Sequence, residues 1–178
     1  MHQSVIIRKR QKGRSYNSIG TAKIRQVVDE HIKATGNKPL VIVDYLQILA
    51  PNVTAASAKQ TIDTAVVELK QIATQHKIPV LAISSFNRDN YSSPVSMTSF
   101  KESGAIEYSS DLLFGLQFKG MDELSQTKDP MRAVEEWRKA DTRELQLKIL
   151  KNRNGASGDS VYFSYYPKYN LFQEMGKR

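Results

Sequence analysis

The sequence has no cysteine among its 178 residues. Neither a disulfide framework nor a thiolate zinc site is therefore possible in this chain. Histidine is also scarce, because only His2, His31 and His76 are present, and they are scattered along the sequence. These absences exclude structural zinc as the basis of the fold.

Long hydrophobic runs are absent as well, since no segment approaches the roughly 20 apolar residues that a membrane span needs. The first ten residues, Met1 to Arg10, are basic and are not followed by the apolar core and cleavage site of a secretory signal. We therefore expect a soluble, non-exported, cytoplasmic protein. With 178 residues and 40% hydrophobic side chains, residues 1–178 are expected to form one globular domain.

Positive charge is in excess and is concentrated at the two ends of the chain. The net charge is +8, from 26 Lys and Arg against 18 Asp and Glu. Met1 to Lys38 holds nine basic and two acidic residues, and Lys148 to Arg178 holds six and two. Such an asymmetry favours a polyanionic partner, most often nucleic acid, because a Lys or Arg that neutralises a phosphate releases counterions. A basic surface that serves solubility alone is the alternative.

Hydrophobic periodicity predicts alternating strands and helices. Strands are expected at Ser4–Arg8, Leu40–Val43, Ile78–Ile83, Asp111–Phe118, Arg143–Lys151, Ser160–Tyr166 and Leu171–Phe172. A first helix is expected to end at Gly36, with Ser18 or Thr21 as its N-terminal cap. Further helices are expected at Ala58–His76, Lys101–Ser110 and Pro130–Lys139. The last of these lies in a polar insertion, residues 119–142, and Phe86–Phe100 is expected to be a long loop.

This order predicts a three-layer α/β domain with a mainly parallel sheet and an antiparallel C-terminal hairpin. Leu40–Val43 is a continuous apolar run, which is typical of a strand buried on both faces. In such sheets ligands bind beyond the carboxyl ends of the strands. Asp44 follows one predicted central strand, and Ser84, Ser85 and Asn87 follow another.

Four apolar residues followed by Asp44 have the Walker B form, in which a carboxylate holds Mg²⁺ beside nucleotide phosphates. Many α/β proteins that bind no nucleotide also carry such a strand. The P-loop that usually accompanies it, G-x-x-x-x-G-K-[ST], is absent from the sequence. Gly115 and Gly120 have the glycine spacing, but Met121-Asp122 follows them. A single copy of the domain should therefore bind ATP poorly and hydrolyse it slowly or not at all.

Lys151 precedes and Arg153 lies within a Gly-rich turn, Asn152 to Asp159, between two alternating strands. A projecting arginine can stabilise the charge of phosphoryl transfer in a neighbouring subunit. The alternative is an ordinary hairpin whose loop is polar because loops are exposed.

Four spaced motifs, taken in order, resemble the C-terminal motor domain of DnaB-type replicative DNA helicases, a hexameric RecA-like ATPase family. They are DYLQIL at Asp44–Leu49, SSFNR at Ser84–Arg88, ESGAIEYSSDL at Glu102–Leu112 and KNRNGASG at Lys151–Gly158. The resemblance spans about Ser4 to Glu174, which is the later part of the motor domain without its Walker A half. It implies a truncated, three-layer RecA-like fold of the P-loop NTPase type. The chain departs from the family pattern at Ser85, where the family has a glutamine that senses the γ-phosphate.

The resemblance implies roles for individual residues and implies ATP and Mg²⁺ as cofactors. Asp44 would be the Mg²⁺-associated carboxylate, and Lys151 and Arg153 would reach the γ-phosphate bound to an adjacent protomer, with Arg153 as the arginine finger. Ser84, Asn87 and Arg88 would bind the nucleotide together with Asp44, and Ser85 would be catalytic together with Asp44, Lys151 and Arg153. Single-stranded DNA would be contacted from the loops at about Pro51–Ser57 and Asp89–Ser99, through Asn52, Thr54, Asn90, Ser92 and Ser93. These loops are not strongly basic, so main-chain N–H groups and hydroxyls would have to supply most contacts.

Three functional hypotheses remain open at this point. The first is a fragment of a DnaB-like helicase motor, which acts with a P-loop-bearing partner chain or in a hexameric ring and does not unwind DNA alone. The second is a non-catalytic module that binds single-stranded DNA or docks onto a helicase ring. The third is a metal-dependent nuclease centred on Asp44, for which Glu102 and Asp111 are the only candidate further carboxylates.

Overall fold

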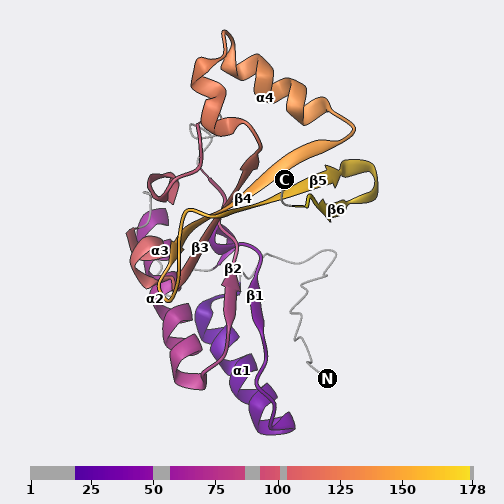
Figure 1. Ribbon diagram of the computed structural model, residues 1–178. Helices are drawn as coiled ribbons and strands as arrows, with labels where there is room; N and C mark the ends of the chain where they lie inside the picture. The colour runs from indigo at the N-terminus through magenta and orange to yellow at the C-terminus, as the bar shows by residue number, and fades with distance from the viewer. Residues whose placement is uncertain (1–18, 50–56, 87–92, 101–103, 177–178) are drawn as a thin grey trace, which may run out of the picture. The chain divides into compact units, whose positions relative to one another are not determined.

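The computed structural model describes residues 19–49, 57–86, 93–100 and 104–176, and Figure 1 traces their helices and strands. The chain divides into two units. The first unit comprises Met1–Ser85 and Glu102–Ser109, and the second comprises Phe86–Lys101 and Ser110–Arg178. The predicted strand Ser4–Arg8 lies outside the described residues.

The first unit contains a two-stranded parallel sheet with its helices. Strands β1 (Val41–Val43) and β2 (Val80–Ala82) pair in parallel, with Ile42 opposite Leu81. Helices α1 (Thr21–Thr35), α2 (Ala58–His76) and α3 (Gly104–Ser109) belong to the same unit. Its core is formed by apolar side chains of the two long helices and of β1, including Ile24, Val28, Val41, Val43, Ala65, Leu69 and Ile72.

Helix α2 has the bounds that the sequence predicts, because both a periodic apolar face and a capping box define it. The Ser57 hydroxyl accepts a hydrogen bond from the Gln60 N–H, and the Gln60 side chain accepts one from the Ser57 N–H. Helix α1 ends at Gly36, as predicted, with this residue in the left-handed conformation at φ 70°.

Two expectations for the first unit are wrong in the described chain. The cap of α1 is Gly20 without a side-chain hydrogen bond, and the Thr21 hydroxyl instead bonds the Glu68 carboxylate of α2. The strand β1 is covered on one face only, since Val41 and Val43 are buried whereas Ile42 is 51% exposed. Continuous apolar character alone therefore did not reveal which face is covered.

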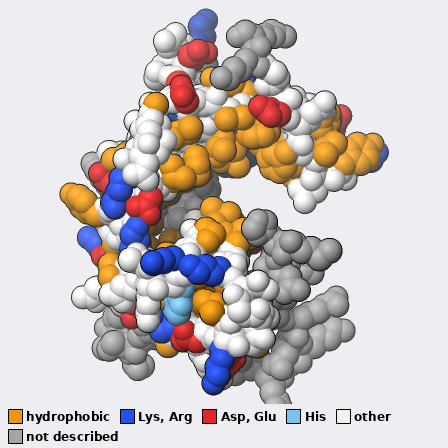
Figure 2. All heavy atoms as spheres, turned by 60° about the horizontal axis from the view of Figure 1, so that its bottom comes forward, with side chains coloured by type: hydrophobic (Ala, Val, Ile, Leu, Met, Phe, Trp, Pro, Cys, Tyr) orange, Lys and Arg blue, Asp and Glu red, His pale blue; other side chains and the backbone are white. Residues whose placement is uncertain are grey.

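The second unit is built on an antiparallel sheet in the order β3-β4-β5-β6. The strands are Leu112–Phe118, Arg143–Asn152, Ser160–Tyr166 and Leu171–Glu174, close to their predicted positions. The β4–β5 hairpin and its Gly-rich turn are confirmed. Figure 2 shows exposed hydrophobic side chains gathered over this unit, and Phe114, Leu116 and Phe172 of the sheet are more than two-fifths exposed.

Residues 119–142 pack a small core of their own against the end of β3. After the turn helix η4 (Met121–Gln126), helix α4 (Pro130–Lys139) begins at Asp129, whose carboxylate accepts from the Arg132 N–H. Met121, Leu124 and Val134 form a buried cluster, against which Phe118, Ala133 and Trp137 pack. The predicted surface helix is thus confirmed, and its apolar side is covered. That residues 119–142 are an insertion in a single domain stays a prediction.

The α/β fold class is confirmed, with one parallel and one antiparallel sheet. Antiparallel strands are more prominent than expected in the described residues, because β3 pairs with β4 in an antiparallel sheet of four strands. The end of the predicted 86–100 loop forms a turn helix, Met97–Phe100. No helix in the described ranges is long and apolar enough to cross a membrane.

Candidate functional site

The carboxyl end of the parallel sheet collects the polar residues that the sequence singles out in the first unit. Asp44 follows β1 directly, and Ser84 and Ser85 follow β2 after one residue. Two backbone hydrogen bonds keep the strand ends together, from the Ile83 N–H to the Val43 carbonyl at 2.9 Å and from the Leu46 N–H to the Ile83 carbonyl at 2.8 Å. The register of the short sheet thereby brings Asp44, Ser84 and Ser85 to one edge.

Gln47 joins the two motifs at this edge. Its amide nitrogen donates to the Ser84 hydroxyl at 3.0 Å and to the Ser85 carbonyl at 3.2 Å. Its amide oxygen accepts from the Ser85 N–H at 3.3 Å. Sequence reasoning assigned Gln47 no role, although it lies within the DYLQIL motif. Gln47 holds the backbone of the SSFNR motif beside the DYLQIL motif. Hydrophobic periodicity does not reveal such a contact.

The Asp44 side chain is exposed at the end of β1. A single carboxylate suits Mg²⁺, which usually keeps several waters and takes one or two carboxylates together with substrate phosphates. Within the described residues no group of three or more His, Cys, Asp or Glu could hold a metal ion. The Asp44 carboxylate is thus of the kind that Mg²⁺ takes, and the nuclease hypothesis gains no support from the described residues.

The β4–β5 turn presents Lys151 and Arg153 in the second unit. The Arg153 guanidinium lies 3.2 Å from the Asp111 carboxylate, and the Arg153 N–H donates to the Asp111 carbonyl at 2.8 Å. Within the turn, Asn152 bonds the backbone of Asn154 and Ala156. Arg153 is exposed and Lys151 is half-buried. The turn is therefore internally ordered and holds its arginine at the surface.

Asp111 is a second residue whose role sequence reasoning missed. It is the aspartate of ESGAIEYSSDL, and the sequence analysis considered it only as a possible nuclease carboxylate. Its contact with Arg153 links that motif to KNRNGASG through a side-chain ion pair and a backbone hydrogen bond. The only signal in the sequence was that both residues lie in motifs that resemble the helicase family.

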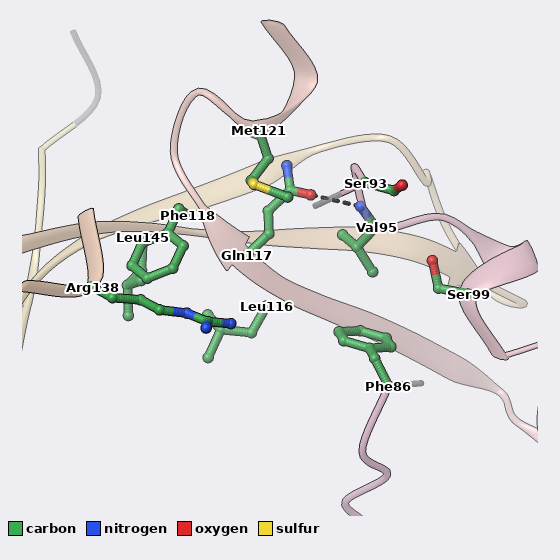
Figure 3. A pocket seen from close by; sticks show the side chains of 10 residues that line it. All are labelled: Phe86, Ser93, Val95, Ser99, Leu116, Gln117, Phe118, Met121, Arg138 and Leu145. Atoms are coloured by element: carbon green, nitrogen blue, oxygen red, sulfur yellow. Dashed lines mark hydrogen bonds between the residues drawn. The ribbon is translucent and has the colours of Figure 1, made fainter. Parts of the chain in front are cut away.

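A pocket of about 250 Å³ opens beside β3 in the second unit (Figure 3). Most of its lining is apolar, and the residues that line it are Phe86, Ser93, Val95, Ser99, Leu116, Gln117, Phe118, Met121, Arg138 and Leu145. In Figure 3 the Gln117 side chain lies next to Val95, whose N–H donates to the Gln117 amide oxygen at 2.7 Å. Ser93 is the one predicted DNA-contacting residue among the described residues, and it borders this pocket.

A polar network lies next to the pocket, with Gln117 and Gln146 buried and Asp122 partly exposed. The Gln117 amide nitrogen donates to Gln146 at 2.8 Å, and the Lys148 ammonium lies 2.8 Å from the Asp122 carboxylate. Partial burial works to raise the pKa of Asp122, but hydrogen bonds from Lys148, Gln117 and Gln146 and the charge of Lys148 outweigh it and hold that pKa below its ordinary range. This network fixes η4 on the sheet.

The remaining predicted site residues lie outside the described residues: Asn52, Thr54, Asn87, Arg88, Asn90 and Ser92. The structure brings Asp44, Ser84 and Ser85 together in the first unit, and it places Lys151 and Arg153 on one turn of the second. The roles assigned to all of these residues stay predictions.

Comparisons with known proteins agree on one family. The family model described as DnaB-like helicase C terminal domain matches residues 3–174. The replicative DNA helicase DnaB of Mycoplasma genitalium is 28% identical over 148 residues, which cover 80% of this chain and 30% of that protein. DnaB of Helicobacter pylori strain J99 is 25% identical over 179 residues, which cover 86% of this chain and 35% of that protein. The chain thus spans about a third of the length of these relatives.

Two solved structures share the fold. One, described as an ATPase domain, superposes with a TM-score of 0.71 at 21% identity, over 89% of this chain and 52% of that one. The other, a DnaB-like replicative helicase described with its interactions with primase, superposes with a TM-score of 0.68 at 22% identity, over 87% of this chain and 36% of that one.

Proposed function

Because this chain belongs to the family of DnaB-like helicase C-terminal domains, we propose that it serves as part of an ATP-driven replicative helicase motor. Such a motor would translocate on single-stranded DNA and unwind the duplex during replication, in the cytoplasm and as a hexameric ring. The proposal includes residues 1–178 as one partial RecA-like domain with residues 119–142 inserted.

On the nucleotide side, Asp44 would hold Mg²⁺ at the carboxyl end of β1. The metal, when bound with ATP, supplies positive charge that offsets the charge of the transferring phosphoryl group. Ser84, Ser85, Asn87 and Arg88 would border the same nucleotide, and Gln47 would keep Ser84 and Ser85 in place. The 178-residue sequence has no P-loop, so the phosphates would be cradled by a P-loop-bearing chain or ring.

In the second unit, Arg153 would act on a nucleotide bound by a neighbouring protomer, assisted by Lys151. Its ion pair with the Asp111 carboxylate is half exposed and therefore stabilises the chain by only about 0–1 kcal/mol, so a phosphate can compete for the guanidinium. An arginine finger raises the rate of phosphoryl transfer by about 10³–10⁵.

The observation that carries this proposal is the hairpin turn that holds Arg153 at the surface, together with Asp44 at the end of β1. The test is complementation of a DnaB-like ATPase domain whose own finger arginine has been replaced. Addition of this chain should restore Mg²⁺-dependent ATP hydrolysis. The variant Arg153→Ala should not restore it, and Arg132→Ala, an exposed arginine of α4, should behave like the parent chain. Equal restoration by all three chains, or by none, contradicts the proposal.

The second candidate is a non-catalytic module that binds single-stranded DNA or docks onto a helicase ring. The absence of a P-loop from the sequence and Ser85 in place of the sensing glutamine favour it. It predicts salt-sensitive DNA binding without any restoration of hydrolysis in the same complementation assay.

A further inference from the structure

From the pocket beside β3 we infer that the second unit holds one base of single-stranded DNA, with Phe86 against the base and Arg138 at the adjoining phosphate. This inference rests on the proposed function, because it assumes that single-stranded DNA is a ligand. It adds a base-binding site to the loop contacts that the sequence suggests.

The size of the pocket limits its occupant. Its volume of about 250 Å³ lies below the roughly 300–1,000 Å³ that is typical of pockets for drug-sized molecules. A single planar ring system fits such a space better than an extended ligand. Most of the lining is apolar, which suits the faces of a nucleobase.

Phe86 supplies an aromatic ring that packs against the ring of Phe100. Its ring centroid lies 5.1 Å from that of Phe100, edge to face, at an interplanar angle of 63°. Phe100 is itself only 8% exposed, so it anchors the Phe86 ring. A fixed aromatic ring at the wall of an open pocket is the element on which proteins stack unpaired bases without reading their sequence.

Arg138 supplies positive charge at the same pocket. Figure 3 shows its side chain extending from α4 past Leu145 toward Leu116. A guanidinium carries five N–H donors in a planar fork, which matches the geometry of a phosphate.

Ser93 and Ser99 also line the pocket, so hydroxyl groups that can donate or accept hydrogen bonds are present beside its apolar walls. The neighbouring loops carry little positive charge, so phosphate contacts from them would supply limited affinity. A stacked base would supply sequence-independent affinity that the loops lack.

The test compares two oligonucleotides of equal length and charge, (dT)20 and the same strand with abasic sites throughout, in binding to the full 178-residue chain. Trp137, the sole tryptophan, packs on the pocket residue Phe118 with ring centroids 5.8 Å apart and reports occupancy by its fluorescence. The parent chain should bind (dT)20 about 5- to 150-fold more tightly than the abasic strand, as expected for one stacked base.

Variants separate the base contact from the phosphate contact. Phe86→Leu, which keeps apolar volume, should abolish the preference for (dT)20, and Phe86→Trp should retain it. Arg138→Ala should weaken binding of both strands and lower the slope of log K against log salt by about 0.7, which corresponds to one phosphate. Arg132→Ala is the control on the same helix. Thermal unfolding of each variant establishes that it is folded.

The outcomes distinguish this inference from the proposed function. If both strands bind with equal, salt-sensitive affinity, or if Phe86→Leu keeps the preference, the base site is wrong while the helicase proposal stands. If neither strand binds even at low salt, both are wrong.

Discussion

Replacement of Leu124 by alanine tests whether residues 119–142 are an integral part of the second unit. Leu124 is 1% exposed and lies at the centre of the cluster with Met121 and Val134. Truncation of such a side chain removes its contacts and leaves a cavity, which costs about 2–5 kcal/mol. At roughly 2–4 °C per kcal/mol for a chain of this size, the unfolding midpoint should fall by about 4–20 °C.

The assay is thermal unfolding followed by circular dichroism and by Trp137 fluorescence, because Trp137 packs against the same cluster. Leu124→Met conserves volume and should cost less than about 1.5 kcal/mol. Met131→Ala, at a side chain on α4 that is 64% exposed, should stay within about 0.5 kcal/mol of the parent. A midpoint for Leu124→Ala within about 2 °C of the parent by both probes would refute the integral packing, and with it the fixed placement of α4 and Arg138.

Three further predictions concern stability. The pKa of Asp122 is lowered in the fold, so its interaction with Lys148 should contribute fully to the free energy of unfolding above the unfolded-state pKa of about 3.9. This contribution should be lost as pH falls through the lowered folded-state pKa. When the free energy of unfolding is measured at decreasing pH, Asp122→Asn should remove this pH-dependent contribution. Gly115→Ala places a Cβ 2.5 Å and 2.7 Å from the two methyl carbons of Val95, so it should lower the free energy of unfolding by about 1–3 kcal/mol. Adding Val95→Ala removes these methyl groups, so the double variant should recover part of the lost stability. Additive effects of the two substitutions would contradict the clash. Ser57→Ala removes the capping box of α2 and should cost about 1 kcal/mol in denaturant unfolding, whereas no change would mean that the cap is dispensable.

Local signals made the helices and most strands predictable from the sequence. The bounds of α2 follow from a capping box and a periodic face, and Gly36 marks the end of α1. The alternating strands β4 and β5 follow from their patterns and from the Gly-rich turn between them. Each of these features is encoded within a few residues of the element that it defines.

Contacts between segments far apart in the sequence were not predictable in this way. Gln47 bonds a backbone 38 residues away, and no periodicity marks such a pair. The contact of Arg153 with Asp111 is likewise non-local. The half exposure of Ile42 also escaped prediction, because an apolar run indicates that a strand can be buried, not which of its faces is covered.

The pocket beside β3 was invisible to sequence reasoning for the same reason. Its walls come from the chain around Phe86 and Val95, from β3, from β4 and from α4. Only Ser93 was singled out beforehand, and it was singled out by resemblance. The shape of the pocket arises from packing among these elements, so no single sequence motif could predict it.

Hydrolysis of ATP by the purified chain tests the central claim most directly. The account holds that the chain supplies Asp44 and Arg153 to a motor but has no P-loop of its own in these 178 residues. With Mg²⁺, and with or without single-stranded DNA, the chain should hydrolyse ATP no faster than its Asp44→Ala variant, while salt-sensitive DNA binding is retained. Hydrolysis that is stimulated by DNA and lost in Asp44→Ala would contradict the account, because the chain would then contain a complete phosphate site.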